Sequence, residues 1–285
     1  MRIPRESRRT VNAVRWGAAL LALSGTTATF APTTALAGGP SGDPGRQKPT
    51  IVLVHGAFAD ASSWNGVVQR LQQNGYTVDA PANPLRGVAQ DSAYLASFLK
   101  SVTGPIILVG HSYGGEVISQ AAVGNPNVKA LVYINAIMPD AGESQAVLAA
   151  KFAPAPLTKA LKQVPFRNAD GTTGTDVYIQ PDQLRQVFAA DLPAGQTAVM
   201  AVTQRPVAMS AFADKLTGAA WRTKPVYALV GRQDRAINPS LERFEAKRAH
   251  ARKTVEIDSS HVSLVSHPQA VKDLIVNAAE DYMWK

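Results

Sequence analysis

The chain has 285 residues, 46% of them hydrophobic and 18% charged, which is the composition of an ordinary globular protein with room for one large α/β domain. It contains no cysteine, and this excludes disulfide bonds, thiol catalysis and cysteine-bound metal sites. The formal net charge of +8 falls to +4 without the first 37 residues, which hold five Arg and one Glu. The remaining sequence contains no basic run with interleaved aromatic residues, so nucleic-acid binding has little support.

Residues 1–37 have the pattern of a bacterial export signal. Five arginines precede a short apolar run at 16–23, and Ala35-Leu36-Ala37 matches a cleavage site. The apolar run is too short to span a bilayer, so no stable membrane anchor is expected. The pair Arg8-Arg9 is also typical of a twin-arginine signal, and the sequence leaves this route and the general secretory route open. We therefore expect an exported protein, either periplasmic or secreted.

Residues 38–49 are rich in Gly and Pro, which predicts a flexible linker. From residue 50 onwards, short apolar runs alternate with helical patterns. The expected strands are 51–54, 76–79, 106–109, 130–134, 226–230 and 254–257, and the expected helices include 64–73, 90–101 and 241–251. This alternation predicts an α/β fold over residues 50–285, with a doubly wound, mostly parallel sheet covered by helices on both faces.

One interval interrupts the alternation. The residues between Ile134 and Val226 contain several prolines and no pattern of a buried strand. A loop of this length without structure of its own is uncommon in a compact domain. We therefore expect a helical cap at about residues 139–221, inserted after a central strand.

The segment Gly110-His-Ser112-Tyr-Gly114 follows one expected strand and precedes a helical run. A serine between two glycines at such a turn indicates a nucleophile elbow, in which the serine adopts a strained backbone conformation above the end of the sheet. The glycines are needed because a Cβ at either position would clash in so tight a turn. We predict that Ser112 is the nucleophile.

A serine hydroxyl becomes reactive when a base removes its proton and a third group orients that base. His261 follows the last expected strand, at the sheet edge where active sites of parallel sheets form, and is the predicted base. Two other histidines have simpler explanations, because His250 lies in a charged helix and His267 precedes the final helix. His111 is expected to point away from the serine, and His55 to hydrogen-bond within its own loop.

Asp234 follows the penultimate strand and is the predicted acid, although aspartate is also common in turns. Asp140 is the rival, because it follows the strand at 130–134, from which an acid can reach the histidine in some sheets of this kind. Asp140 would also serve as a helix N-cap. Asp258 is too close in sequence to His261 to orient it easily and is expected to stabilise the loop.

The oxyanion of an acyl-transfer reaction needs preorganised N–H donors. One is expected from the backbone of Tyr113, directly after the nucleophile. The other should come from the loop after the first strand, where Gly56 lets the chain turn back toward the elbow and leaves the N–H of Ala57 as the preferred donor. Phe58 is the alternative donor, and its ring is expected to form a wall of the substrate pocket.

Together these motifs resemble the α/β-hydrolase superfamily: a His-Gly-x loop, the Gly-x-Ser-x-Gly turn, and then the acid and histidine in the order Ser112, Asp234, His261. Within it, Leu53-Val-His-Gly-Ala57 followed by Ser63-Trp64 resembles bacterial esterase-like relatives of plant salicylate-type methylesterases and hydroxynitrile lyases. The resemblance implies a serine esterase that uses no metal and no cofactor and acts on a small-molecule ester.

The resemblance also raises other activities. Hydroxynitrile lyases with this loop pattern usually carry lysine directly after the catalytic histidine, where this chain has Val262, which favours an esterase. Cofactor-free perhydrolases use the same triad, so the sequence does not separate them from esterases. A non-catalytic ligand-binding protein on this fold would be expected to have lost a triad member. The largely apolar cap favours an ester with a small to medium, largely apolar acyl or alcohol group.

Overall fold

The computed structural model describes residues 47–284, so the expected export signal and most of the expected linker lie outside the described residues. All six expected strands are present. They are β1 (Thr50–Val54), β2 (Val78–Asp79), β3 (Ile106–His111), β4 (Val128–Ile134), β8 (Val226–Gly231) and β9 (Lys253–Ile257). They form one parallel sheet in the order β2-β1-β3-β4-β8-β9, which confirms the predicted α/β architecture.

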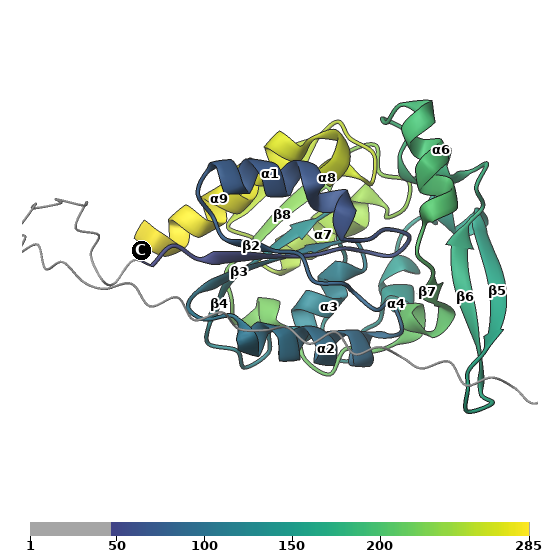
Figure 1. Cartoon of the computed structure of the whole chain (residues 1–285), viewed down its shortest axis with the longest axis horizontal. Helices are drawn as coiled ribbons and strands as arrows, with labels where there is room; N and C mark the ends of the chain where they lie inside the picture. The colour runs from purple at the N-terminus through teal and green to yellow at the C-terminus, as the bar shows by residue number, and fades with distance from the viewer. Residues whose placement is uncertain (1–46, 285) are drawn as a thin grey trace, which may run out of the picture. The chain divides into compact units, whose positions relative to one another are not determined.

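Helices cover both faces of this sheet (Figure 1). On one side lie α1 (Asn65–Gln73), preceded by the 3-10 turn η1 (Ala61–Trp64), together with α8 (Ser263–Ser266) and α9 (Pro268–Trp284); on the other lie α2 (Val88–Ser101) and α3 (Gly114–Ala121). A further helix, α7 (Pro239–Arg248), packs against β8. Because both faces are covered, every residue of β3 and β8 is buried, which explains why these strands appear as continuous apolar runs in the sequence.

The insertion between β4 and β8 contains strands as well as helices. Its helices are α4 (Gln145–Ala149), α5 (Leu184–Phe188) and α6 (Ala194–Thr203), and its 3-10 turns are η2 (Pro156–Lys159), η3 (Met209–Ala213) and η4 (Ala220–Arg222). An antiparallel sheet runs in the order β5-β6-β7, formed by Leu161–Arg167, Thr173–Ile179 and Val207–Ala208.

The expected helical cap is thus corrected to a mixed one. The strand β5 has no fully buried residue and contains Pro165, and β6 begins with exposed or half-buried small and polar residues. A strand that is solvated on most of its surface has no buried apolar run. Continuous apolar runs indicate the core strands but do not indicate β5 or β6.

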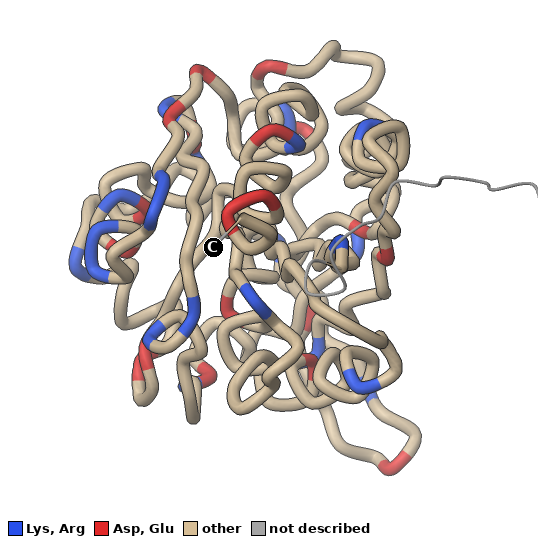
Figure 2. The backbone as a smooth tube through the Cα atoms, turned by 90° about the vertical axis from the view of Figure 1, so that its left-hand side faces the viewer, with Lys and Arg blue, Asp and Glu red and all other residues tan. Residues whose placement is uncertain are grey.

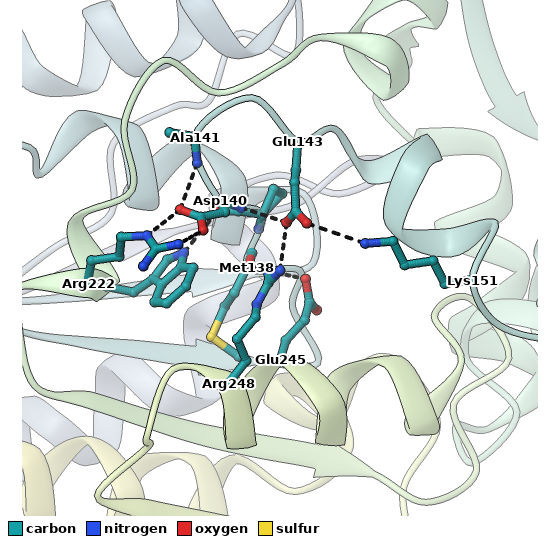
Figure 3. A network of polar contacts seen from close by, with 10 residues as sticks. Met138, Asp140, Ala141, Glu143, Lys151, Arg222, Glu245 and Arg248 are labelled. Atoms are coloured by element: carbon teal, nitrogen blue, oxygen red, sulfur yellow. Dashed lines mark hydrogen bonds and ion pairs between the residues drawn. The ribbon is translucent and has the colours of Figure 1, made fainter.

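The two ends of the insertion are bonded to each other (Figure 3). Asp140, at the start, receives both arms of the Arg222 guanidinium, with Nε 2.6 Å from Oδ1 and a second nitrogen on Oδ2. The indole nitrogen of Trp221 donates to the Pro139 carbonyl at 2.9 Å. The insertion therefore leaves and rejoins the core at adjacent points.

The helix α7 holds the same region from the core side (Figure 3). Arg248 donates to Glu143 and to the Met138 carbonyl, both at 2.7 Å. The Met138 N–H in turn donates to Oε1 of Glu245 at 2.9 Å. These bonds fix the first residues of the insertion on the helix that follows β8.

The antiparallel sheet of the insertion is attached to the core at a second place. The Arg86 guanidinium forms an ion pair with Asp176 of β6 at 2.7 Å and donates to the Pro206 carbonyl at 3.0 Å. Beside it, the N–H of Ala208 donates to the carbonyl of Leu85 at 2.9 Å. The insertion is therefore anchored both at its stem and through its sheet.

The positions of basic and acidic residues are spread along several elements of the backbone in Figure 2. Some of them pair across neighbouring elements, as Arg243 of α7 does with Glu256 of β9 at 2.8 Å. No helix within residues 47–284 is both long enough and apolar enough to cross a membrane.

Candidate active site

Ser112 lies at the apex of the turn between β3 and α3, and its φ of +54° lies in the left-handed region, as the elbow pattern predicts. A Cβ added at Gly110 would lie 2.6 Å from the Gly114 carbonyl oxygen, and one added at Gly114 would lie 2.6 Å from the Val54 carbonyl oxygen. Neither position can hold a side chain without moving the backbone. Ser112 is partly exposed, so the strained turn presents it toward solvent.

His261 and Asp234 contact each other below the surface. Nδ1 of the imidazole lies 2.6 Å from Oδ2 of the carboxylate, and the two side chains are 1% and 0% exposed. The residues follow β9 and β8, which are neighbours in the sheet, so their loops open at the same edge. Oδ1 of Asp234 accepts the N–H groups of Ala236 and Ile237 at 2.7 and 2.9 Å.

The elbow and the histidine loop are also in contact. Nε2 of His111 lies 3.0 Å from the His261 carbonyl oxygen, and the two ring centroids are 4.8 Å apart. Within residues 47–284, the Ser112 hydroxyl forms no hydrogen bond, to His261 or to another residue. Such bonds are often long in enzymes without a ligand and tighten when substrate binds. Burial lowers the pKa of His111 well below its usual value, so this ring is neutral and supports the His261 backbone.

The rival acid, Asp140, is engaged elsewhere (Figure 3). Besides the two bonds from Arg222, Oδ1 of Asp140 accepts the N–H of Ala141 at 2.8 Å. The hydrogen bonds from Arg222 hold the pKa of Asp140 below its usual value. The imidazole of His261 is bonded to Asp234 instead.

The remaining candidates lie outside this cluster. Asp258 is exposed and pairs with Arg232 at 3.0 Å, which fits the expected role in the loop. His250 is exposed, as expected, but lies in the turn after α7 and not within the helix, and His267 precedes α9 as expected. None of these three residues bonds to Ser112, Asp234 or His261 within the described part of the chain.

The loop after β1 lies directly against the elbow, because a Cβ added at Gly56 would be 2.6 Å from Cβ of Ser112. The N–H of Phe58 donates to the Arg205 carbonyl of the insertion at 3.0 Å. The N–H groups of Ala57 and Tyr113, by contrast, donate no hydrogen bond within residues 47–284. Of the two alternatives for the second oxyanion donor, Ala57 is therefore the one whose N–H is available.

His55 has the structural role expected of it. Its Nε2 accepts the N–H of Asn83 at 2.9 Å, so the ring proton lies on Nδ1, which donates to the Gly56 carbonyl at 3.0 Å. Burial lowers the pKa of this imidazole, which keeps it neutral. These bonds fix the loop that carries Ala57 and Phe58.

Aromatic side chains cover the histidine. Phe188 of α5 lies 5.0 Å from the His261 ring, between centroids, and meets the ring of Phe58 edge-on at 6.0 Å. Phe188 is 2% exposed and Phe58 is 6% exposed. The insertion thus closes an apolar layer over the buried face of the imidazole.

Three buried glutamates lie on the helices that follow the elbow and the acid loop. Glu116 belongs to α3, and Glu242 and Glu245 belong to α7. Within the described residues, the carboxylates of Glu116 and Glu242 have no hydrogen-bond partner, and Glu245 uses only one oxygen. Burial raises the pKa of Glu116 and of Glu242 well above the usual value, and raises that of Glu245 to about 8. Burial therefore favours the protonated form of all three carboxyls.

A cavity of about 600 Å³ lies between the insertion and the loops after β4 and β8. Among the described residues, no charged side chain lines it; its walls include Leu157, Leu161 and Phe212 of the insertion and Ile137 and Ile237 of the core. A second cavity of about 330 Å³ is lined by Phe58, Met200 and Val265 together with polar residues. The expected place of Phe58 in a pocket wall fits the second cavity, and Ser112 lines neither of the two.

Two residues that hold this site were not predicted from the sequence. Asn135, at the end of β4, donates its side-chain amide to Oδ2 of Asp234 at 3.2 Å. A polar residue directly after a buried strand was a signal for it. Asp191 of the insertion accepts the N–H of Ser260 at 3.0 Å and its hydroxyl proton. Asp191 lies far from Ser260 in sequence, and no local pattern marks it.

Known proteins are similar to the chain in sequence and in fold. A carbendazim hydrolyzing esterase of Nocardioides sp. (strain SG-4G) is 33% identical over 119 residues, which cover 36% of this chain and 48% of that protein. An alpha/beta hydrolase of Aspergillus novofumigatus (strain IBT 16806) is 26% identical over 254 residues, covering 81% of this chain and 97% of that protein. The crystal structure of polyneuridine aldehyde esterase shares the fold, with a TM-score of 0.71 at 19% identity over 81% of this chain and 99% of that one.

The family model described as the alpha/beta hydrolase family matches residues 51–274. This match includes the elbow, the acid loop and the histidine loop, and the chain belongs to the alpha/beta hydrolase family.

Proposed function

We propose that the chain is a serine esterase that hydrolyses a small-molecule carboxylic ester, with Ser112, His261 and Asp234 as its catalytic triad. The observation that carries the proposal is the buried 2.6 Å bond between His261 and Asp234 at the sheet edge that also carries the strained Ser112. Relatives named as a carbendazim hydrolyzing esterase and a pyrethroid hydrolase support the class of reaction.

In the proposed reaction, Nε2 of His261 accepts the hydroxyl proton of Ser112 while the serine oxygen attacks the ester carbonyl carbon. The N–H groups of Ala57 and Tyr113 stabilise the resulting oxyanion. The imidazolium, held by Asp234, then gives its proton to the leaving alcohol, and an acyl-serine remains. A water molecule, deprotonated by the same imidazole, attacks the acyl-serine, which releases the acid and restores the hydroxyl.

The larger cavity supports an apolar substrate. Two of its wall residues adjoin the proposed triad, since the N–H of Ile137 lies 3.4 Å from the Ser112 carbonyl oxygen and the N–H of Ile237 bonds to Asp234. We assign the apolar acyl or alcohol group to this cavity, because its walls offer no charge to a polar group. Phe58 would contact the substrate from the side of the second cavity.

The test is a series of p-nitrophenyl esters of increasing acyl length. Ser112→Ala and His261→Ala should each fold normally and lower turnover by about 10⁴ to 10⁶-fold, and the double variant should be no slower than either alone. A fluorophosphonate probe should label the wild type and not Ser112→Ala. Near-normal turnover by Ser112→Ala would refute the assignment.

The same ester series tests the cavity. Leu157→Trp narrows it and should lower kcat/KM for the longer esters by about 10-fold or more, while the acetate ester is little affected. Val199→Trp is the matched control, because Val199 is 61% exposed on α6 and lines neither cavity. An equal effect of Leu157→Trp on all esters would place the acyl group elsewhere.

A further inference from the structure

Asn135 lies where three loops of the sheet edge meet. It follows β4, it contacts Asp234 after β8, and it contacts Ser263 after β9. Its side chain is fully buried. A Cβ added at Gly231, the last residue of β8, would lie 2.5 Å from the Asn135 side-chain nitrogen, so the end of β8 is shaped to admit this amide.

The orientation of the amide follows from its partners. A carboxylate oxygen only accepts hydrogen bonds, so the group that faces Oδ2 of Asp234 at 3.2 Å is the NH₂ of Asn135. The amide oxygen then faces Ser263 and accepts the proton of its hydroxyl. Ser263 is two residues from His261, and His261 bonds to the same Oδ2 at 2.6 Å. The contacts therefore close a ring through Ser263, Asn135, Asp234 and His261.

We infer that Asn135 is a positioning residue that holds the Asp234 carboxylate and the His261 loop in one geometry. This inference rests on the proposed triad. The amide fixes Oδ2, the oxygen that the imidazole uses, whereas the backbone donors of Ala236 and Ile237 fix the other oxygen. Its bond to Ser263 links the acid to the chain that carries the base. Asn135 does not contact the reacting atoms and acts through Asp234.

A purely conformational role is the competing explanation. Asn135 has a φ of +43°, and Asn tolerates this left-handed region better than most residues. Glycine adopts it without strain. The variant Asn135→Gly therefore removes the amide without straining the backbone, and it separates the two explanations.

Positioning predicts that Asn135→Gly keeps KM near the wild-type value and lowers kcat on the order of 10²-fold, the usual cost of a misplaced reacting group. Ser263→Ala should lower kcat less, and the double variant should be no slower than Asn135→Gly alone. A kcat of Asn135→Gly within about twofold of the wild type would overturn the inference and leave only the conformational role.

Asn135→Asp provides a second measurement, the pH dependence of kcat, which a purely conformational role of Asn135 would leave unchanged. The new carboxyl would face Asp234 and Ser263, with His261 bonded to the far side of the pair through Asp234 and with Glu242 of α7 as the next titratable group near Asp234. When protonated, its O–H replaces the lost donor, and when ionised it repels Asp234. The ratio of kcat for Asn135→Asp to that for Asn135→Gly should therefore be high at pH 6 and fall as the pH rises. A ratio near one at every pH would overturn the inference.

The contacts can also be tested without a substrate. The proton NMR resonance of His261 Nδ1–H reports its bond to Asp234, and it should move in Asn135→Gly but not in the exposed control Val199→Ala. Failure of the wild type to hydrolyse any ester would refute the proposed function alone. An unmoved resonance in Asn135→Gly would refute the positioning role, whatever the reaction is.

Discussion

Asp140 and Asp234 each follow a strand of the same parallel sheet, and their partners differ in kind. Asp140 is bonded to the guanidinium of Arg222, a full positive charge, at the stem of the insertion. Asp234 is fully buried and, among residues 47–284, accepts hydrogen bonds from neutral N–H donors in addition to its bond with the imidazole. Within the described residues, no Lys or Arg forms an ion pair with it.

This difference bears on which of the two carboxylates could orient His261 in the proposed triad. A carboxylate that is neutralised by arginine has little charge left to stabilise a nearby imidazolium. Neutral donors fix the Asp234 carboxylate and leave its charge uncompensated, so an imidazolium that forms on His261 becomes its counter-ion. The partners of the two residues, more than their positions in the chain, favour Asp234.

The largest effect is expected from Asp234→Asn. The amide keeps the shape but can offer NH₂ to Nδ1, which favours the wrong tautomer of His261, and turnover should fall by about 10² to 10⁴-fold. Steady-state kinetics on one p-nitrophenyl ester would measure this loss. Asp140→Asn, assayed in parallel, is the matched control. Normal turnover of Asp234→Asn would contradict the proposal that Asp234 orients His261.

An intermediate effect, on the free energy of unfolding, is expected from Glu245→Gln. Glu245 lies on α7, the helix that follows the Asp234 loop and contacts the start of the insertion at Met138. Glu245 has an ordinary pKa of 4.5 and a pKa of about 8 in the fold, because burial disfavours the charged form. Between these values the folded protein keeps a proton that the unfolded chain releases, so the contribution of Glu245 to stability is present below pH 4.5 and is lost as the pH rises toward 8.

Glu245→Gln should remove this dependence. Its free energy of unfolding, measured by urea denaturation, should rise by a few kcal/mol relative to the wild type between pH 5 and pH 8. The exposed residue Glu280 supplies the control, Glu280→Gln, which should leave the pH dependence unchanged. A constant difference between Glu245→Gln and the wild type at all pH values would show that folding does not raise the pKa of Glu245.

The smallest effect is expected from Asp140→Asn. Arg222 is 60% exposed, so loss of its ion pair should change the free energy of unfolding only slightly. Turnover should stay within about twofold of the wild type, because within residues 47–284 no bond joins Asp140 to the proposed triad. A large loss of turnover in Asp140→Asn with normal stability would instead indicate that Asp140 is the acid of the triad.

The core was predictable because its strands are buried on both faces, which forces continuous apolar runs such as β3 and β8. The elbow was predictable because so tight a turn admits only glycine at Gly110 and Gly114. Both are local requirements, and local requirements leave patterns in the sequence.

The remaining features depend on partners far apart in the chain. Asn135 bonds to residues 99 and 128 positions away, and Asp191 holds the histidine loop from 69 positions away. No spacing rule connects such residues before the fold is known. The strand β5 was missed for another reason, since most of its surface is solvated and it needs no apolar run.

The bonded stem of the insertion has a consequence for how this protein could diversify. The chain leaves the core beside Pro139 and returns beside Trp221, and these two residues are themselves hydrogen-bonded. A segment whose ends already meet can be lengthened, shortened or exchanged with little added cost of loop closure and without displacing the strands on either side. Recombination could therefore replace the insertion as one unit, provided that the new segment restores the contacts that Asp176 and Asp191 make with the core.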